Sequence, residues 1–139
     1  MRKSIAILLT TILGVLVVAS VALAASKTIT VKMTGKQETP AGSPTGTGSA
    51  TVTLNSATGR VCFKLNWSGI GSPSAAHIHK AAAGKAGPVV IPFFGGTAKK
   101  TGCVNASKSL VSAIVKKPSS YYVNVHTAKY PNGALRGQL

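Results

Sequence analysis

The chain has 139 residues, of which 16 are lysine or arginine and one is acidic, so its formal net charge is +15. The single acid, Glu38, excludes paired-carboxylate acid–base catalysis and calcium-type sites, and the lack of aspartate excludes a Ser-His-Asp triad. Because these catalytic sets are missing, we expect a protein that is not an enzyme.

Residues 1–24 have the pattern of a cleavable secretory signal peptide. A basic start at positions 2 and 3 precedes an apolar run over residues 5–18, and Ala22-Leu23-Ala24 gives the small-x-small cleavage pattern. An uncleaved membrane anchor is the competing interpretation. We expect cleavage, no transmembrane segment afterwards, and one monomeric domain over residues 25–139, secreted or held in the cell envelope.

The rest of the chain is dominated by apolar and polar residues in alternation, the period of a β-strand. Turn-forming residues separate the alternating runs, and residues 107–116 instead show helical spacing with Ser107 as a possible cap. Two prolines confine residues 88–94 to an edge or irregular strand. The expected strands cover residues 29–33, 50–54, 61–67, 75–79, 88–94, a stretch through 103, 121–126 and 134–139. This pattern predicts an all-β fold, an immunoglobulin-like or Greek-key β-sandwich or barrel with one short helix.

The chain contains two cysteines, Cys62 and Cys103. A pair of cysteines in an exported domain usually forms a disulfide, while a buried thiol pair and a soft-metal site are the alternatives. No Cys-x-x-Cys spacing is present. We therefore expect a bridge between the two.

All three histidines occur in two strand motifs. His77 and His79 flank Ile78, so both imidazoles project from one face of a strand, and His126 ends a second strand. If the two strands are neighbours, three imidazoles can converge on one ion, and imidazole-only sets suit copper or zinc. The alternative is that the histidines only make hydrogen bonds or cover the surface.

The positive charge suggests polyanionic partners. Without the basic residues at positions 2 and 3, 14 remain against one acid, a net charge of about +13. The first interpretation is that this charge only keeps a secreted protein soluble. The alternative is that the surface attracts anionic cell-surface polymers. Nucleic acid is disfavoured because no basic helix or ladder of aromatic residues is present.

Several segments together resemble the CHRD domain, a module named from chordin that also occurs as a stand-alone exported bacterial protein. The resemblance implies an immunoglobulin-like β-barrel or sandwich and no particular activity. The matching segments are Thr34-Gly35-Lys36-Gln37-Glu38-Thr39-Pro40, Ala50–Leu54, Ala75-Ala76-His77-Ile78-His79, Ala86–Val90, Tyr122-Val123-Asn124-Val125-His126-Thr127 and Arg136-Gly137-Gln138-Leu139.

The order of the histidines and Arg136 is also similar, more faintly, to that of the copper-site residues of Cu/Zn superoxide dismutases. This likeness implies that His77, His79 and His126 bind copper and that Arg136 draws an anion towards it. The favoured alternative for Arg136 is a charge on the face of a strand without a role in binding. The chain has no fourth histidine for a bridging ligand and no zinc ligands, so dismutase activity is not implied.

Three functions follow from these patterns. The first is a non-enzymatic binding or structural module at the cell surface, whose partner is an anionic polymer or another protein. The second is a copper-binding protein, redox-active or not, and the third is a binder of polyanions or nucleic acid.

Overall fold

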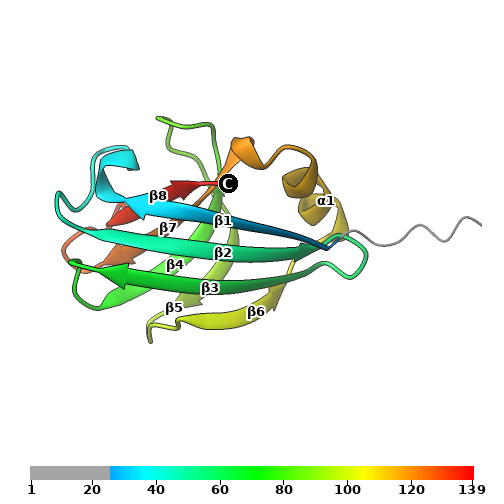
Figure 1. Cartoon of the computed structure of the whole chain (residues 1–139), viewed down its shortest axis with the longest axis horizontal. Helices are drawn as coiled ribbons and strands as arrows, with labels where there is room; N and C mark the ends of the chain where they lie inside the picture. The colour runs from blue at the N-terminus through cyan, green and yellow to red at the C-terminus, as the bar shows by residue number, and fades with distance from the viewer. Residues whose placement is uncertain (1–25) are drawn as a thin grey trace, which may run out of the picture.

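A computed structural model describes residues 26–139, in which eight antiparallel strands form one sheet that curls into a nearly closed barrel (Figure 1). The strand order across the sheet is β5-β4-β7-β8-β1-β2-β3-β6, and the edge strands β5 and β6 approach each other. The all-β prediction is thereby confirmed. The strands are β1 (Ser26–Thr34), β2 (Thr47–Asn55), β3 (Arg60–Ser68), β4 (Pro73–Lys80), β5 (Val89–Gly95), β6 (Thr101–Asn105), β7 (Tyr121–Thr127) and β8 (Leu135–Gln138).

The predicted signal peptide, residues 1–24, lies outside the described residues. Between Ser26 and Leu139, the helices are all too short or too polar to cross a membrane. The described chain is thus the β-rich domain itself, preceded by the segment for which cleavage is expected.

The hairpin of β2 and β3 shows how the sequence sets the register. Asn55 accepts hydrogen bonds through its side-chain oxygen from the amides of Ala57 and Thr58, both at 3.1 Å. Gly59 then adopts φ +78°, a left-handed conformation that favours glycine. The turn brings Val52 opposite Phe63 and Thr51 opposite Lys64, so the apolar residues of both strands face the barrel interior.

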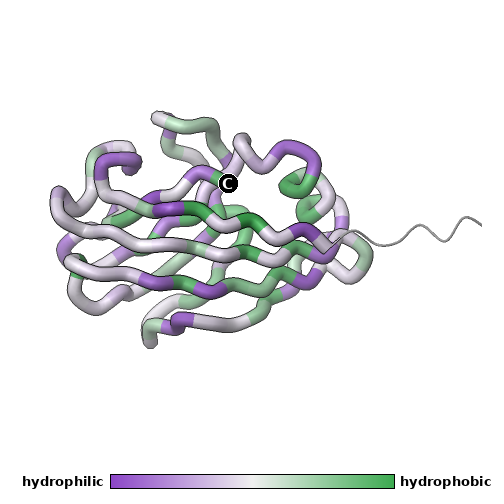
Figure 2. The backbone as a smooth tube through the Cα atoms, in the orientation of Figure 1, coloured by the Kyte–Doolittle hydropathy of each residue, from purple (hydrophilic) through white to green (hydrophobic). Residues whose placement is uncertain are grey.

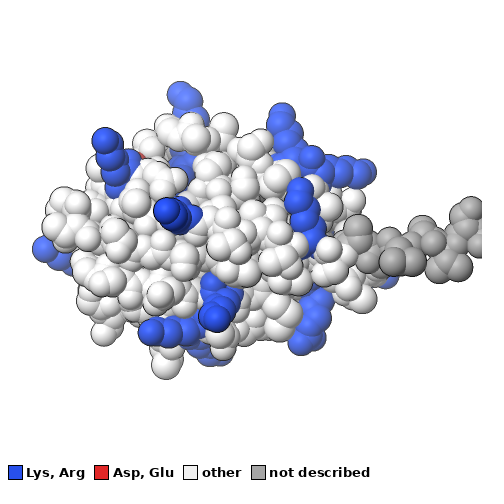
Figure 3. Space-filling model, viewed as in Figure 1, with Lys and Arg blue, Asp and Glu red and all other residues white. Residues whose placement is uncertain are grey.

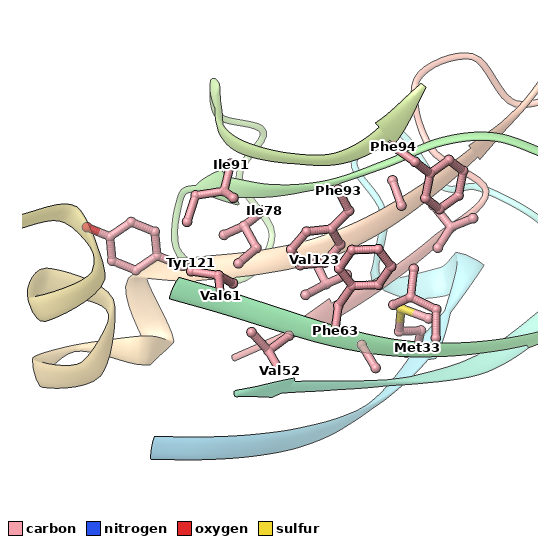
Figure 4. Packing of buried hydrophobic residues seen from close by; sticks show 14 of the residues in the cluster. Met33, Val52, Val61, Phe63, Ile78, Ile91, Phe93, Phe94, Tyr121 and Val123 are labelled. Atoms are coloured by element: carbon pink, nitrogen blue, oxygen red, sulfur yellow. The ribbon is translucent and has the colours of Figure 1, made fainter. Parts of the chain in front are cut away.

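The core fills the space between opposite walls of the barrel. Phe63 from β3 and Phe93 from β5 stack with ring centroids 4.5 Å apart (Figure 4). Hydrophobic residues recur along the strands and on the inner side of the helix (Figure 2). Burial of each large apolar side chain contributes about 1.5–3 kcal/mol. The inward residues of the sheet are therefore the main stabilising set.

The predicted helix is α1 (Lys108–Lys116), which lies at one end of the barrel (Figure 1). Ser107 caps it, because its hydroxyl accepts a hydrogen bond from the amide of Leu110 at 3.2 Å. Val111 and Ile114 face the core and are fully buried. The short 3-10 turns η1 (Gly35–Gln37) and η2 (Pro118–Ser120) complete the described elements.

The predicted disulfide is confirmed. Cys62 on β3 lies directly opposite Cys103 on β6, and the two sulfur atoms are bonded. The bridge ties the edge strand β6 to its neighbour and closes a loop with a sequence separation of 41. At the other edge, β5 pairs with β4 through two register shifts, in keeping with its prolines.

Candidate metal centre

The three histidines lie on neighbouring strands. His77 and His79 belong to β4 and His126 to β7, and the two strands pair so that His77 lies opposite Asn124 and Ala75 opposite His126. Because side chains alternate along a strand, all three imidazoles project from the outer surface of the barrel wall. One nitrogen from each ring can be chosen so that the three atoms lie within 4.8 Å of one another.

The hydrogen bonds fix the orientation of two rings. The Nδ1 atom of His79 donates to the carbonyl of Gly87 at 2.8 Å, and that of His126 donates to the carbonyl of Pro131 at 2.8 Å. In a neutral imidazole, the other nitrogen then carries the lone pair. Both rings therefore present Nε2 as a ligand atom.

The two Nε2 atoms differ in their surroundings. That of His126 is 3.0 Å from the side-chain oxygen of Asn124 and 3.2 Å from Nδ1 of His77, while that of His79 is buried and has no hydrogen-bond partner among the described residues. A buried polar atom without a partner costs about 1–3 kcal/mol. A metal ion at this point would relieve that cost at His79.

Two of the three imidazoles have a lowered pKa. Burial is the main cause that lowers the pKa of His77 to about 4, and the nearby His126 and His79 contribute as like charges. Burial likewise lowers the pKa of His126, which its hydrogen bond to Pro131 partly offsets. Neutral imidazole is the form that binds a metal, so the lowered pKa values keep these two rings available as ligands at a lower pH than an ordinary imidazole.

A layer of polar side chains surrounds the histidines. We call the outward residues of β4, β7 and β8 the histidine face: His77, His79, Tyr122, Asn124, His126, Arg136 and Gln138. The ring of Tyr122 stacks on His79 with centroids 4.9 Å apart, and the guanidinium of Arg136 lies 3.5 Å from the centroid of Tyr122 on a cation–π contact. The stack restricts the rotation of the His79 ring.

Arg136 holds the loop between β4 and β5 against this face by hydrogen bonds. Its side chain is 1% exposed and donates to the carbonyls of Lys85 at 2.7 Å and Ala82 at 2.9 Å. The loop between β4 and β5 thus lies over β8, and Gln138 adds a hydrogen bond to the carbonyl of Ala81. The guanidinium predicted to attract an anion is bound to the protein's own carbonyl groups.

Glu38 connects the loop after β1 to the histidine face. It is buried beside Arg136 and is hydrogen-bonded to the backbone of Thr39, in its own loop, and to the side chain of Asn124. Burial raises its pKa to about 7, although Arg136 and the hydrogen bonds act in the opposite direction. Asn124 is also 3.0 Å from Nε2 of His126. This amide therefore links the only carboxylate of the chain to the histidines.

A pocket of about 220 Å³ opens next to Glu38 and Arg136, between the loops that follow β1 and β4. It is the place where a small anion would come nearest to Arg136. Attraction of an anion by this residue stays a prediction. The signal for Asn124 was present in the sequence, since it shares a strand face with His126 two residues away.

Comparison with protein families gives one match, to the family described as CHRD domain, over residues 29–139. Comparisons with curated proteins and with solved structures give no match. The matched range contains every residue of the histidine face and both cysteines.

Proposed function

The chain belongs to the CHRD domain family, and we propose that it is an exported, non-enzymatic binding module that holds one copper ion through His77, His79 and His126. The observation that carries the proposal is the convergence of three imidazole nitrogens within 4.8 Å. Nitrogens bound to one ion at about 2.0–2.1 Å lie roughly 3–4 Å apart. The separation of 3.2 Å between His77 and His126 already has this value, so small ring rotations would complete the set.

Copper is favoured by the ligand chemistry. The set consists of imidazoles alone, and among divalent first-row ions an N-donor site binds copper most tightly. Zinc is the natural competitor because it also accepts imidazole. The buried Nε2 of His79 and the lowered pKa values of His77 and His126 support a metal rather than a purely hydrogen-bonding role.

An extracellular setting agrees with the disulfide between Cys62 and Cys103 and with the family. Disulfides form and persist in oxidising compartments. The predicted signal peptide would deliver the domain there. The proposal concerns binding, and no catalytic step is assigned to the histidines.

The test is a copper titration of untagged protein after removal of metal. We expect saturation at one equivalent and nitrogen ligation by electron paramagnetic resonance. His77→Ala, His79→Ala and His126→Ala should each weaken binding at least about tenfold, since each removes one ligand. His77→Gln is added because it retains a polar side chain at a half-buried position, and circular dichroism checks folding.

Thr30→Ala serves as a matched control, because Thr30 is exposed on a strand outside the histidine face. It should bind copper like the unmodified protein. Equal affinity in all the histidine variants would overturn the proposal. Tighter binding of zinc than of copper would overturn the choice of metal.

A further inference from the structure

The opposite wall of the barrel carries a second polar surface, which we call the open face. It consists of the outward residues of β1, β2, β3 and β6, and none of them is acidic or a large hydrophobic residue. Hydroxyl pairs such as Thr30 and Thr51, 3.0 Å apart, cross it from strand to strand. Its members are Ser26, Thr28, Thr30, Lys32, Thr34, Thr47, Ser49, Thr51, Thr53, Asn55, Arg60, Cys62, Lys64, Asn66, Ser68, Thr101, Cys103 and Asn105.

Two adjacent hollows run across this face. One of about 410 Å³ includes Lys32, and the other, of about 520 Å³, includes Lys64 and Lys100. Ser49 and Asn66 line both, so the hollows form one trough. The Cα atoms of Lys32 and Lys64 are two strands and two residues apart, a distance of about 12 Å. The trough therefore presents spaced cations with hydroxyl and amide groups between them.

The charge of the surface is of one sign. Within residues 26–139 the only acidic side chain is Glu38, which is buried on the other wall, so every exposed charged side chain there is a lysine or arginine. Figure 3 shows this side of the barrel, with blue side chains on and around β1–β3. Val89 on β5 is the one large hydrophobic residue exposed in the described chain. The open face thus fits a polar anion rather than an apolar partner.

We propose that the open face binds an acidic polysaccharide laid along the trough. Lys32, Lys64 and Lys100 would pair with its carboxylates, and the hydroxyl and amide groups between them would hydrogen-bond the sugar hydroxyls. This partner suits the surface better than single-stranded nucleic acid, which needs aromatic platforms for its bases. Trp67, the aromatic residue lining the trough, is half-buried and has the Lys100 ammonium 5.4 Å above its ring.

The site is independent of the proposed copper centre. It is built on β1, β2, β3 and β6, whereas the histidines lie on β4 and β7, which are separated from it by β8 in the sheet. Failure of copper binding would consequently leave this proposal standing, and the reverse holds as well. The two are tested by different ligands.

The experiment measures binding of polygalacturonate oligomers of defined length by calorimetry between about 50 and 200 mM salt. The variant Lys32→Gln/Lys64→Gln/Lys100→Gln should lose at least about tenfold in affinity, and its salt dependence should fall by about one unit of slope per lysine. The matched control is Lys108→Gln/Lys116→Gln/Lys117→Gln at α1, which removes the same charge elsewhere. It should stay within about threefold of the unmodified protein.

A further variant, Asn66→Asp, places one negative charge where the two hollows meet and should weaken binding on its own. An equal loss in both triple variants would show that net charge alone attracts the polymer and would overturn the proposal. Equal binding of neutral dextran, or tighter binding of single-stranded DNA of the same length, would overturn it too. Weakening by Asn66→Asp, with the control unaffected, would support it.

Discussion

The histidine face and the open face both arise from the alternation of side chains along strands. They differ in how far their side chains are exposed to solvent. On the histidine face, the loops after β1 and β4 lie over the strands, and Asn124 and Arg136 are each 1% exposed. On the open face Lys32, Lys64 and Asn66 remain exposed. The periodicity of a strand therefore decides which way a side chain points, whereas the loops decide whether it is solvated.

The difference has chemical consequences. Under the loops, burial lowers the pKa of His77 to about 4 and raises that of Glu38 to about 7, so both groups favour their neutral forms. The open face is suited to long-range attraction of charged polymers instead. The first wall therefore suits the small ion proposed above, and the second suits the proposed extended ligand.

The largest effect is expected from the covalent bond that belongs to the open face. Replacing both Cys62 and Cys103 by alanine should lower the free energy of unfolding by about 2–5 kcal/mol, because the unfolded chain regains the freedom of a long loop. Urea denaturation measures this change. Copper affinity should stay the same, since β3 and β6 are remote from the histidines. A loss of copper binding would show that the two walls are coupled.

The stability cost of removing a cation can be compared between the two walls. Arg136→Met removes a buried guanidinium from the carbonyls of Lys85 and Ala82 and should cost about 3 kcal/mol. Lys64→Met, on the open face, should change stability by less than about 0.5 kcal/mol. Thermal and urea unfolding compare the two. Similar costs would mean that the covering loop contributes nothing to the difference between the walls.

Asn124 and Asn66 offer a matched pair for the metal site. Asn124→Ala removes the amide that contacts His126 and Glu38, and loss of such a supporting contact weakens metal binding about 10-fold to 100-fold. Asn66→Ala should leave copper affinity unchanged. Competition with a chelator of known affinity gives both values. If the two variants bind copper alike, Asn124 does not position the ligands.

A pH dependence of the stability is expected from Glu38. The pKa of Glu38 is about 7 in the folded protein and 4.5 as the reference for an unfolded chain, so the folded state binds the extra proton between these values. Its stabilising contribution is full below pH 4.5 and is lost as the pH rises through 7. Glu38→Gln should therefore gain stability relative to the unmodified protein from pH 4.5 to 8. Unfolding curves at several pH values measure the difference, and a constant difference would contradict the buried environment.

The strands, the helix and the disulfide could be predicted because their signals are local or fixed by composition. Alternation over residues 61–67 and the cap at Ser107 depend on near neighbours in the chain. The placement of His77 and His79 on one face followed from the same rule. The pairing of β4 with β7 did not follow from this rule, because the pairing of distant strands depends on the topology of the whole sheet.

The coverage of the histidine face could not be predicted for a different reason. Arg136 recognises the carbonyl groups of Lys85 and Ala82, and a backbone carbonyl has no signature in the sequence. Glu38 reaches Asn124 through a loop whose path is set by packing against Gly133, where an added Cβ would clash with the carboxylate. Sequence patterns thus located the candidate ligands and left their surroundings open.

The position of β8 has a consequence for the timing of assembly. It is the last of the eight described strands along the chain, yet it lies between β7 and β1. It therefore joins the early strands β1, β2 and β3 to the later strand β7. Until residues 135–138 have left the ribosome, β1 lacks its second neighbour and Arg136 is not present to hold the loop. The barrel must consequently close after synthesis of the domain is complete. A nascent chain halted before residue 135 should remain open and accessible to proteases.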